Sequence, residues 1–217
     1  MCWNADISLN TFLFSFGVLA LIYYNNTYTK YKTGEFDNPW LYVFLFLVIV
    51  IQLIEFFIWR NLNNKEYNRW LSIAGMAVLF LQPISSLMLL SDEYLRNICI
   101  VLYSLISIPS VIIKMTQDSK NIKTTVVNKH LYWNFNFVHD TFLMNFAWFF
   151  FFFFSFFFEK RYIRAIFGIA LFLVTIFYST NWSFGSMWCW SVNFGMMFYA
   201  ARLLFYLPFV ELTTDTI

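Results

Sequence analysis

Seven polar or aromatic side chains lie within otherwise apolar segments, and their types suit the binding of a small polar solute or an ion. They are Gln52, Glu55, Gln82, His139, Asp140, Trp190 and Asn193. Glu55 and Asp140 would supply negative charge, and His139 would change its charge close to neutral pH. The amides would add neutral hydrogen bonds and the indole an aromatic wall, a mixture typical of small-solute sites.

The same segments contain no motif for catalysis or for metal binding. The chain has two histidines, His130 and His139, so a zinc site would need cysteines or carboxylates from distant segments. Its serines and cysteines have no histidine partner nearby other than His139. A retinal Schiff base needs a lysine in mid-membrane, whereas Lys114 is expected at a helix end and the last helix offers Arg202. We therefore expect no enzyme activity, no cofactor and no bound metal.

The composition indicates that these residues belong to a membrane protein. Hydrophobic residues make up 60% of the 217-residue chain, aromatic residues 24% and charged residues 12%, with a mean hydropathy of +0.62. Soluble domains carry about 25% charged residues, so this chain has too little polar surface to cover a water-soluble globule. A net charge of +2 provides no footprint for nucleic acid. A soluble enzyme, a disordered chain and a nucleic-acid binder are thereby disfavoured.

Long apolar segments predict an all-α, polytopic bundle of seven transmembrane helices that forms a single integral membrane domain over residues 1–217. A helix needs about 20 apolar residues to cross the bilayer, and the segments lack the alternation of barrel strands. The predicted helices are residues 5–24, 39–59, 70–90, 98–115, 133–158, 162–179 and 184–206. Pro83 lies inside the third helix and should free a carbonyl there. The phenylalanine-rich run 149–158 has no polar face and is expected to face lipid.

Alternating helix directions would bring Glu55, His139, Asp140 and Asn193 into the half of the bilayer nearest the N-terminus, here called the N-terminal side. One interpretation is a polar cavity open to that side. The alternative is a structural polar network, in which Glu55 pairs with Lys114 or Arg60, or unrelated side chains that reach toward the interface. Lysines and arginines are balanced between the two sides. The charges that flank the first helix favour an N-terminus outside, in a membrane that the sequence does not identify.

Two matches between the halves of the chain predict an internal repeat. The first pairs Trp3, Asn4, Thr11, Phe12, Leu13 and Phe16 with Trp133, Asn134, Thr141, Phe142, Leu143 and Phe146. The second pairs Trp70, Gly75 and Met76 with Trp190, Gly195 and Met196. Two parallel three-helix units, at about 1–90 and 133–206, would then be joined by the linker helix 98–115. Asn4, Ser8, Thr11 and Ser15 also form one stripe on the first helix, which should face protein.

This 3+1+3 arrangement resembles the SWEET and PQ-loop group of small transporters in size and helix count. Neither half has the Pro-Gln pair of that group, and Gln82 precedes Pro83 instead, so no residue roles are carried over. A second resemblance rests on Met1, Cys2, Trp3 and Asn4, on the segment Gln52–Asn61, and on Leu81, Gln82 and Pro83. These residues resemble an uncharacterised heptahelical membrane family of large DNA viruses and algae, which implies a membrane protein without assigning it an activity.

The leading functional hypothesis is a transporter of a small polar solute or ion through the polar cavity. Protonation of Glu55 or Asp140 would change the charge of that cavity. The alternative is a non-catalytic membrane receptor, or a viral protein that assembles or remodels membranes. The expected partners are the lipid bilayer and a small polar solute or ion, with a homo-oligomer left open and no nucleic acid.

Overall fold

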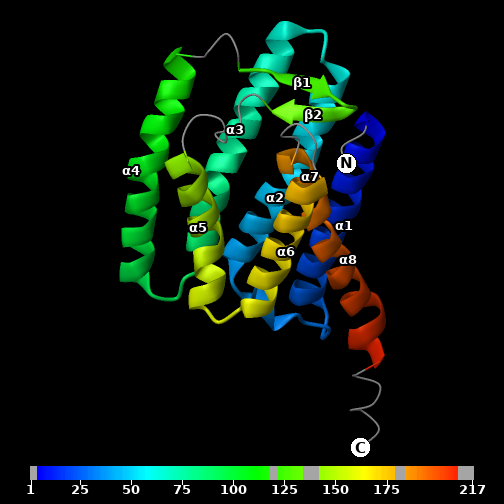
Figure 1. The fold of residues 1–217 in the computed structure, drawn as a ribbon. Helices are drawn as coiled ribbons and strands as arrows, with labels where there is room; N and C mark the ends of the chain where they lie inside the picture. Colours follow the sequence, from blue (N-terminus) through cyan, green and yellow to red (C-terminus); the bar gives the residue numbers. More distant parts are fainter. Residues whose placement is uncertain (1–3, 118–121, 134–141, 179–183, 210–217) are drawn as a thin grey trace, which may run out of the picture.

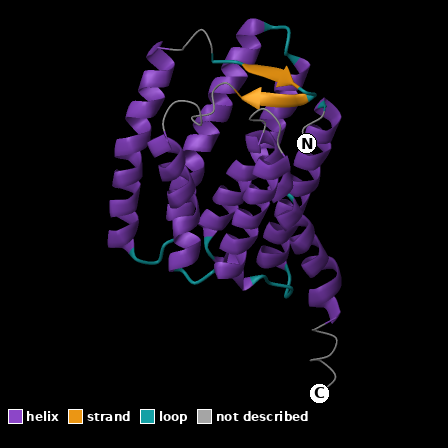
Figure 2. Cartoon of the chain, in the orientation of Figure 1, coloured by secondary structure: helices purple, strands orange, loops and turns teal. Residues whose placement is uncertain are grey.

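The computed structural model describes residues 4–117, 122–133, 142–178 and 184–209, and it is a bundle of up-and-down helices with one β-hairpin at the N-terminal side (Figures 1 and 2). The first half contains α1 (Ala5–Tyr28), the 3-10 turn η1 (Gly34–Asp37), α2 (Pro39–Arg60), α3 (Lys65–Leu87) and α4 (Glu93–Gln117). The second half contains β1 (Thr124–Val127), β2 (His130–Trp133), α5 (Phe142–Phe158), α6 (Tyr162–Tyr178), α7 (Phe184–Val192), α8 (Phe194–Ala201) and the π-helical turn η3 (Arg202–Tyr206). The predicted helical class is confirmed.

Two helices begin earlier than the apolar pattern predicted, because polar capping residues extend them beyond their apolar cores. In α3, the Asn64 side chain accepts hydrogen bonds from the backbone N–H groups of Glu66 and Tyr67, both at 3.2 Å. In α4, Asp92 accepts one from the N–H of Leu95 at 3.0 Å. These caps satisfy N–H groups that have no intrahelical acceptor, so the first turn forms in spite of its polarity.

The proline in α3 has a specific structural consequence. Pro83 has no N–H, so it cannot bond the Leu79 carbonyl one turn earlier. The indole Nε1 of Trp148 in α5 donates to that carbonyl at 2.8 Å, and the Tyr103 hydroxyl of α4 donates to the Phe80 carbonyl at 3.1 Å. The freed carbonyl predicted from the sequence thus becomes an attachment point that holds α5 against α3.

Helix α5 lies between α3, α4 and α6, so only part of its phenylalanine run is exposed. The prediction that the whole run faces lipid is wrong for the buried members, which are Phe151, Phe152, Phe153 and Phe156. Phe150, Phe157 and Phe158 are exposed. Ser86 of α3 donates to the Phe152 carbonyl at 2.7 Å, so a polar contact accompanies this aromatic packing. A helix that is apolar all round can be buried on several faces at once.

The segment between α4 and α5 contains a hairpin that the sequence interpretation missed. Strands β1 and β2 pair antiparallel, with Thr124 opposite Trp133 and Val127 opposite His130. The two-residue turn has φ values of 50° at Asn128 and 64° at Lys129, as a type I′ hairpin turn requires. Trp133 therefore ends a strand, and the predicted start of a helix at this residue is wrong.

The last predicted helix, residues 184–206, is distorted at one residue, Asn193, whose φ of −64° and ψ of −15° remain in the right-handed helical region. Asn193 separates α7 from α8, and the backbone hydrogen bonds there join residues three apart, as in a 3-10 turn, instead of four apart. The Asn193 N–H donates to Trp190 O at 3.1 Å, and the Met196 N–H donates to Asn193 O at 2.9 Å. The matching stretch of α3, around Trp70 and Gly75, is continuous, so the two stretches of the suggested repeat differ in backbone.

The helices pack mostly against their neighbours in the chain. Helix α2 packs against α1 and α3, α3 also packs against α4 and α5, and α6 packs against α7. The arrangement closes where α8 meets α1, while α7 also contacts α2 (Figure 1). The interior between α1, α2, α3 and α7 therefore holds any polar side chains that these helices turn inward.

Candidate functional site

Three of the predicted site residues are buried in the interior of the bundle. Gln52 and Glu55 lie on one face of α2 and Gln82 lies on α3, with exposed fractions of 0%, 1% and 0%. The Gln82 amide donates to the Leu47 carbonyl at 3.1 Å. Because Leu47 and Glu55 are eight residues apart on α2, Gln82 lies about 12 Å farther from the N-terminal side than Glu55 does. These side chains thus form a polar series along the interior of the bundle, and none of the three lies on its outer surface.

Asn193 contributes to the same interior from the break between α7 and α8. Its Oδ1 accepts a hydrogen bond from the Ser15 hydroxyl of α1, and its Nδ2 donates to the Cys189 carbonyl at 2.8 Å. Of the predicted polar stripe on the first helix, Ser8 and Ser15 are fully buried, whereas Thr11 is partly buried and Asn4 is exposed, so the stripe faces protein only in part. The asparagine therefore both satisfies the interrupted backbone and ties it to α1.

The remaining predicted residues are placed differently. Trp190 is partly exposed and packs edge-on against Phe194, with ring centroids 5.1 Å apart. His139 and Asp140 lie outside the described residues. Of the basic partners suggested for Glu55, Arg60 lies over the Phe56 ring, 5.9 Å from its centroid, and Lys114 is buried near the end of α4. Within the described ranges, no three His, Cys, Asp or Glu side chains gather as a metal site would require.

The hairpin lies across the N-terminal end of this interior (Figure 2). The Asn68 amide of α3 donates to the Thr124 carbonyl at 2.9 Å and accepts from the Thr124 N–H at 2.8 Å. Ser72 adds a hydroxyl contact to the Thr124 side chain at 3.0 Å. The Asn68 amide thus makes the two backbone hydrogen bonds that a neighbouring strand would make at the edge of β1. Asn68, Ser72 and Thr124 are all buried. Neutral hydrogen bonds therefore hold the hairpin on this end.

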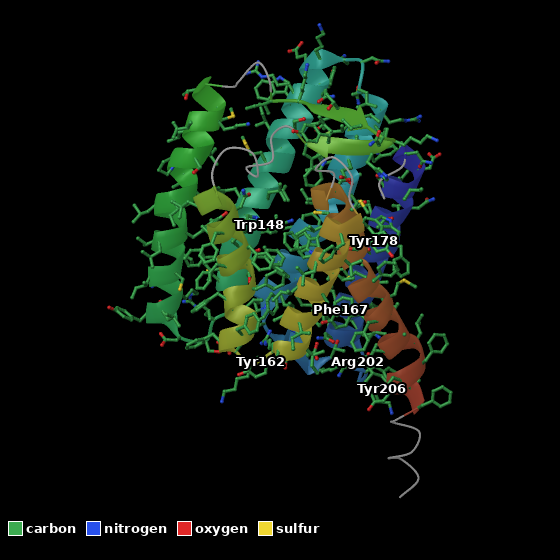
Figure 3. The ribbon with its side chains drawn as sticks, in the orientation of Figure 1. Trp148, Tyr162, Phe167, Tyr178, Arg202 and Tyr206 are labelled. Carbon is green, nitrogen blue, oxygen red and sulfur yellow. The ribbon has the colours of Figure 1, made fainter. Side chains whose placement is uncertain are left out.

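A group of charged residues at the opposite end was missed by the sequence interpretation. The Glu35 carboxylate of η1 binds Arg164 of α6, accepts from Arg202 at 3.2 Å and accepts from the Tyr199 hydroxyl at 3.2 Å. We call these four residues the Glu35 cluster. It joins the loop between α1 and α2 to α6 and to the start of the π-helical turn. Arg202 lies at the lower end of the bundle in Figure 3.

Local structure places Glu35 for these contacts. The Asn26 side chain bonds the Thr33 backbone at its N–H (2.9 Å) and at its carbonyl (3.1 Å), which fixes the start of η1. Phe36 is buried and packs against Tyr199, with ring centroids 5.2 Å apart. With Phe36 anchored inward, the adjacent Glu35 is directed at the two arginines. The available sequence signal was a pair of arginines in apolar helices on one side, which require a carboxylate partner.

These features define the class of the protein. Five segments are long and apolar enough to cross a membrane: Ala5–Tyr28, Pro39–Arg60, Lys65–Leu87, Glu93–Thr116 and Gly185–Phe209. The fold is therefore a helical bundle compatible with a multi-pass integral membrane protein. No protein-family model matches the chain, and no curated protein or solved structure matches it either.

Proposed function

We propose that this chain crosses the membrane seven times and carries a small polar solute or ion through the bundle. Besides the five long segments, α5 and α6 have 17 residues each, which would span about 25 Å and fit a bilayer core with slight thinning. The segment Gly185–Phe209 would cross once, although it is interrupted.

The observation that carries this proposal is the interruption at Asn193. Regular helices satisfy their own backbone in lipid, so a break inside a span is tolerated where protein or a solute supplies the missing partners. Transporters place such breaks at their binding sites, close to the bilayer midplane. Ser15 lies close to the middle of the 24-residue α1, which sets the Ser15–Asn193 contact at a similar depth. Solute would exchange with this contact, while Gln52 and Gln82 line its path.

The two ends of the bundle would serve as alternating barriers. The hairpin covers the N-terminal end, and the Glu35 cluster closes the other by joining η1 to α6 and η3. In the proposed 3+1+3 organisation, both the Glu35 cluster and the Ser15–Asn193 bond connect the first unit to the second. A rocking motion of one unit against the other would then break one barrier while the other stays intact. Protonation of Glu55 would couple this motion to a proton.

Flux through proteoliposomes tests the proposal directly. Wild-type protein should transport at least one member of a panel of small polar solutes and ions above the leak of empty vesicles. Asn193→Ala, which removes the Ser15 contact, should lower that flux by about tenfold or more, equivalent to about 1.4 kcal/mol. Asn97→Ala, at an exposed asparagine of α4, is the matched control and should leave the flux unchanged.

The outcome that contradicts transport is equally definite. Folded wild-type protein, verified by its helical circular dichroism, would show no flux for any solute with or without a pH gradient. That result would favour the receptor or membrane-assembly hypotheses. Equal flux from wild type and Asn193→Ala would show that the break at Asn193 takes no part in transport.

A further inference from the structure

A surface pocket at the corner between α5 and α6 has the properties of a second binding site, which shares Glu35 and Arg164 with the Glu35 cluster. Its volume is about 270 Å³, and it is lined by Glu35, Lys160, Arg161, Tyr162, Ile163 and Arg164. The corner lies at the end of the bundle opposite the hairpin, where Figure 3 shows Tyr162. Three cations thus face one carboxylate in a pocket large enough for a phosphate group.

One carboxylate cannot neutralise all three of these cations. Glu35 already binds Arg164, Arg202 and Tyr199 in the Glu35 cluster. No ion pair joins Lys160 or Arg161 to a carboxylate in the described ranges. The pocket therefore keeps an excess of positive charge.

The acid nearest in sequence is also engaged elsewhere. Glu159 accepts hydrogen bonds from the Ser91 N–H at 2.7 Å and from the Ser91 hydroxyl at 3.1 Å, which holds it against the loop between α3 and α4. Meanwhile Arg161 Nη1 and Arg164 Nη1 are buried and have no acceptor among the described residues. Guanidinium N–H groups in this state favour an anionic oxygen, since a buried donor without a partner is costly.

The turn that presents these groups is well defined. The Arg161 N–H donates to the Phe156 carbonyl at 2.7 Å, and the Lys160 N–H donates to the Phe157 carbonyl at 3.1 Å. This pair of bonds forms a Schellman motif, with Lys160 in the left-handed position at φ 56°. Glycine is the usual residue there because it lacks a Cβ. A lysine at this position places a charge beside the pocket at some conformational cost.

The surroundings of the pocket indicate where its anion would come from. Ile163 is 86% exposed and Ile166 is 61% exposed, and Phe157, Phe158 and Tyr162 are also exposed. In a membrane-spanning bundle, such apolar side chains at a helix end contact acyl chains, and the aromatic rings lie at the headgroup level. A phospholipid whose phosphate occupies this pocket would therefore place its acyl chain along α6.

We propose that this pocket binds the phosphate of an anionic phospholipid. The guanidinium groups of Arg161 and Arg164, which line the pocket, attract the phosphate oxygens, and Lys160 adds a third positive charge. Ile163 and Ile166 contact the acyl chain. Basic pockets between transmembrane helices recognise anionic lipids in this way.

Native mass spectrometry of the full chain in detergent tests the assignment. Phosphatidylglycerol and phosphatidylcholine with identical acyl chains are titrated separately, and the bound fraction gives an affinity for each. The test variant is Lys160→Gly/Arg161→Gln, which removes two charges and places the preferred residue in the turn, so it keeps the fold. Wild type should bind phosphatidylglycerol at least tenfold more tightly than the variant does, with equal affinities for phosphatidylcholine.

Matched controls separate this site from general charge effects and from free phosphate. Lys65→Gln/Lys123→Gln removes two exposed lysines at the hairpin end and should bind phosphatidylglycerol as the wild type does. Inorganic phosphate at the concentration of the lipid should not displace it. Equal phosphatidylglycerol affinity in wild type and test variant overturns the proposal, as does an equal loss in the lysine control. Displacement of the lipid by equimolar phosphate assigns the pocket to soluble phosphate and overturns the lipid assignment.

Discussion

The two ends of the bundle are closed by different chemistry. At the N-terminal side, Asn68 and Ser72 hold the hairpin through neutral hydrogen bonds to Thr124 that are fully shielded from water. At the other side, Glu35 holds Arg164 and Arg202 through ionic bonds, and the Glu35 and Arg164 side chains are 36% and 24% exposed. Salt screens exposed charges strongly and buried neutral bonds hardly at all. The ionic end is therefore the one that ionic conditions can loosen.

The largest expected effect comes from breaking the neutral end. Asn68→Ala leaves the Thr124 N–H and C=O without partners in a buried environment, which should cost about 2–4 kcal/mol of stability at this end. The measurement is hydrogen exchange of the peptides that cover β1 and β2, followed by mass spectrometry. Asn63→Ala, at an exposed asparagine just before α3, is the control and should exchange as the wild type does. Unchanged protection of β1 in Asn68→Ala would show that the amide does not hold the hairpin.

A smaller effect is expected at the ionic end. Glu35→Gln removes the charge shared by the two arginines, and partial exposure limits the loss to about 1 kcal/mol. The melting temperature in detergent should fall by about 2–4 °C at low salt. The difference from wild type should shrink in 1 M NaCl, where the Debye length is about 3 Å and the wild-type pairs are screened. A difference that is independent of salt would contradict an ionic closure.

The neighbouring carboxylate provides the control for this prediction. Asp37 is exposed on the same 3-10 turn and forms no ion pair in the described part of the chain. Asp37→Asn should therefore melt as the wild type does at both salt concentrations. A similar loss in both variants would assign the effect to the net charge of the loop rather than to the Glu35 cluster.

The smallest expected effect is a pH dependence of the hairpin. Burial lowers the pKa of His130 below its usual 6.5, so the folded hairpin favours the neutral imidazole. The unfolded hairpin binds more protons below that value, so stability is fully present above pH 6.5 and declines as the pH falls. Hydrogen exchange of β2, corrected for intrinsic rates, should accelerate from pH 7.5 to pH 5.5. In His130→Gln this acceleration should disappear, and its persistence there would contradict the assignment.

Several features of this fold could be predicted from the sequence because they depend on local pattern. Long apolar runs set the helices, and Pro83 predicted a freed carbonyl that Trp148 now bonds. The i and i+3 spacing of Gln52 and Glu55 on an apolar helix predicted a shared face that avoids lipid, and both are buried. Each of these features is determined by residues within one or two turns of the same helix, so it can be predicted from a single sequence.

The features that escaped prediction depend on competing local signals or on distant partners. The hairpin had two such signals, its β-branched residues at 124–127 and an asparagine at the left-handed turn, but its strands are short and adjoin long apolar helices. The Asn193 side chain bonds Ser15, which lies 178 residues away in sequence. A single sequence contains no record of which distant residues meet.

The Glu35 cluster has a consequence for the order in which the protein is made. Synthesis proceeds from the N-terminus, and Glu35 precedes Arg164 by 129 residues and Arg202 by 167. The first two helices would thus leave the ribosome and enter the bilayer long before their loop meets either arginine. The contact with Arg202 can form only after residue 202 has been made, so a chain that stops earlier lacks the second arginine of the cluster.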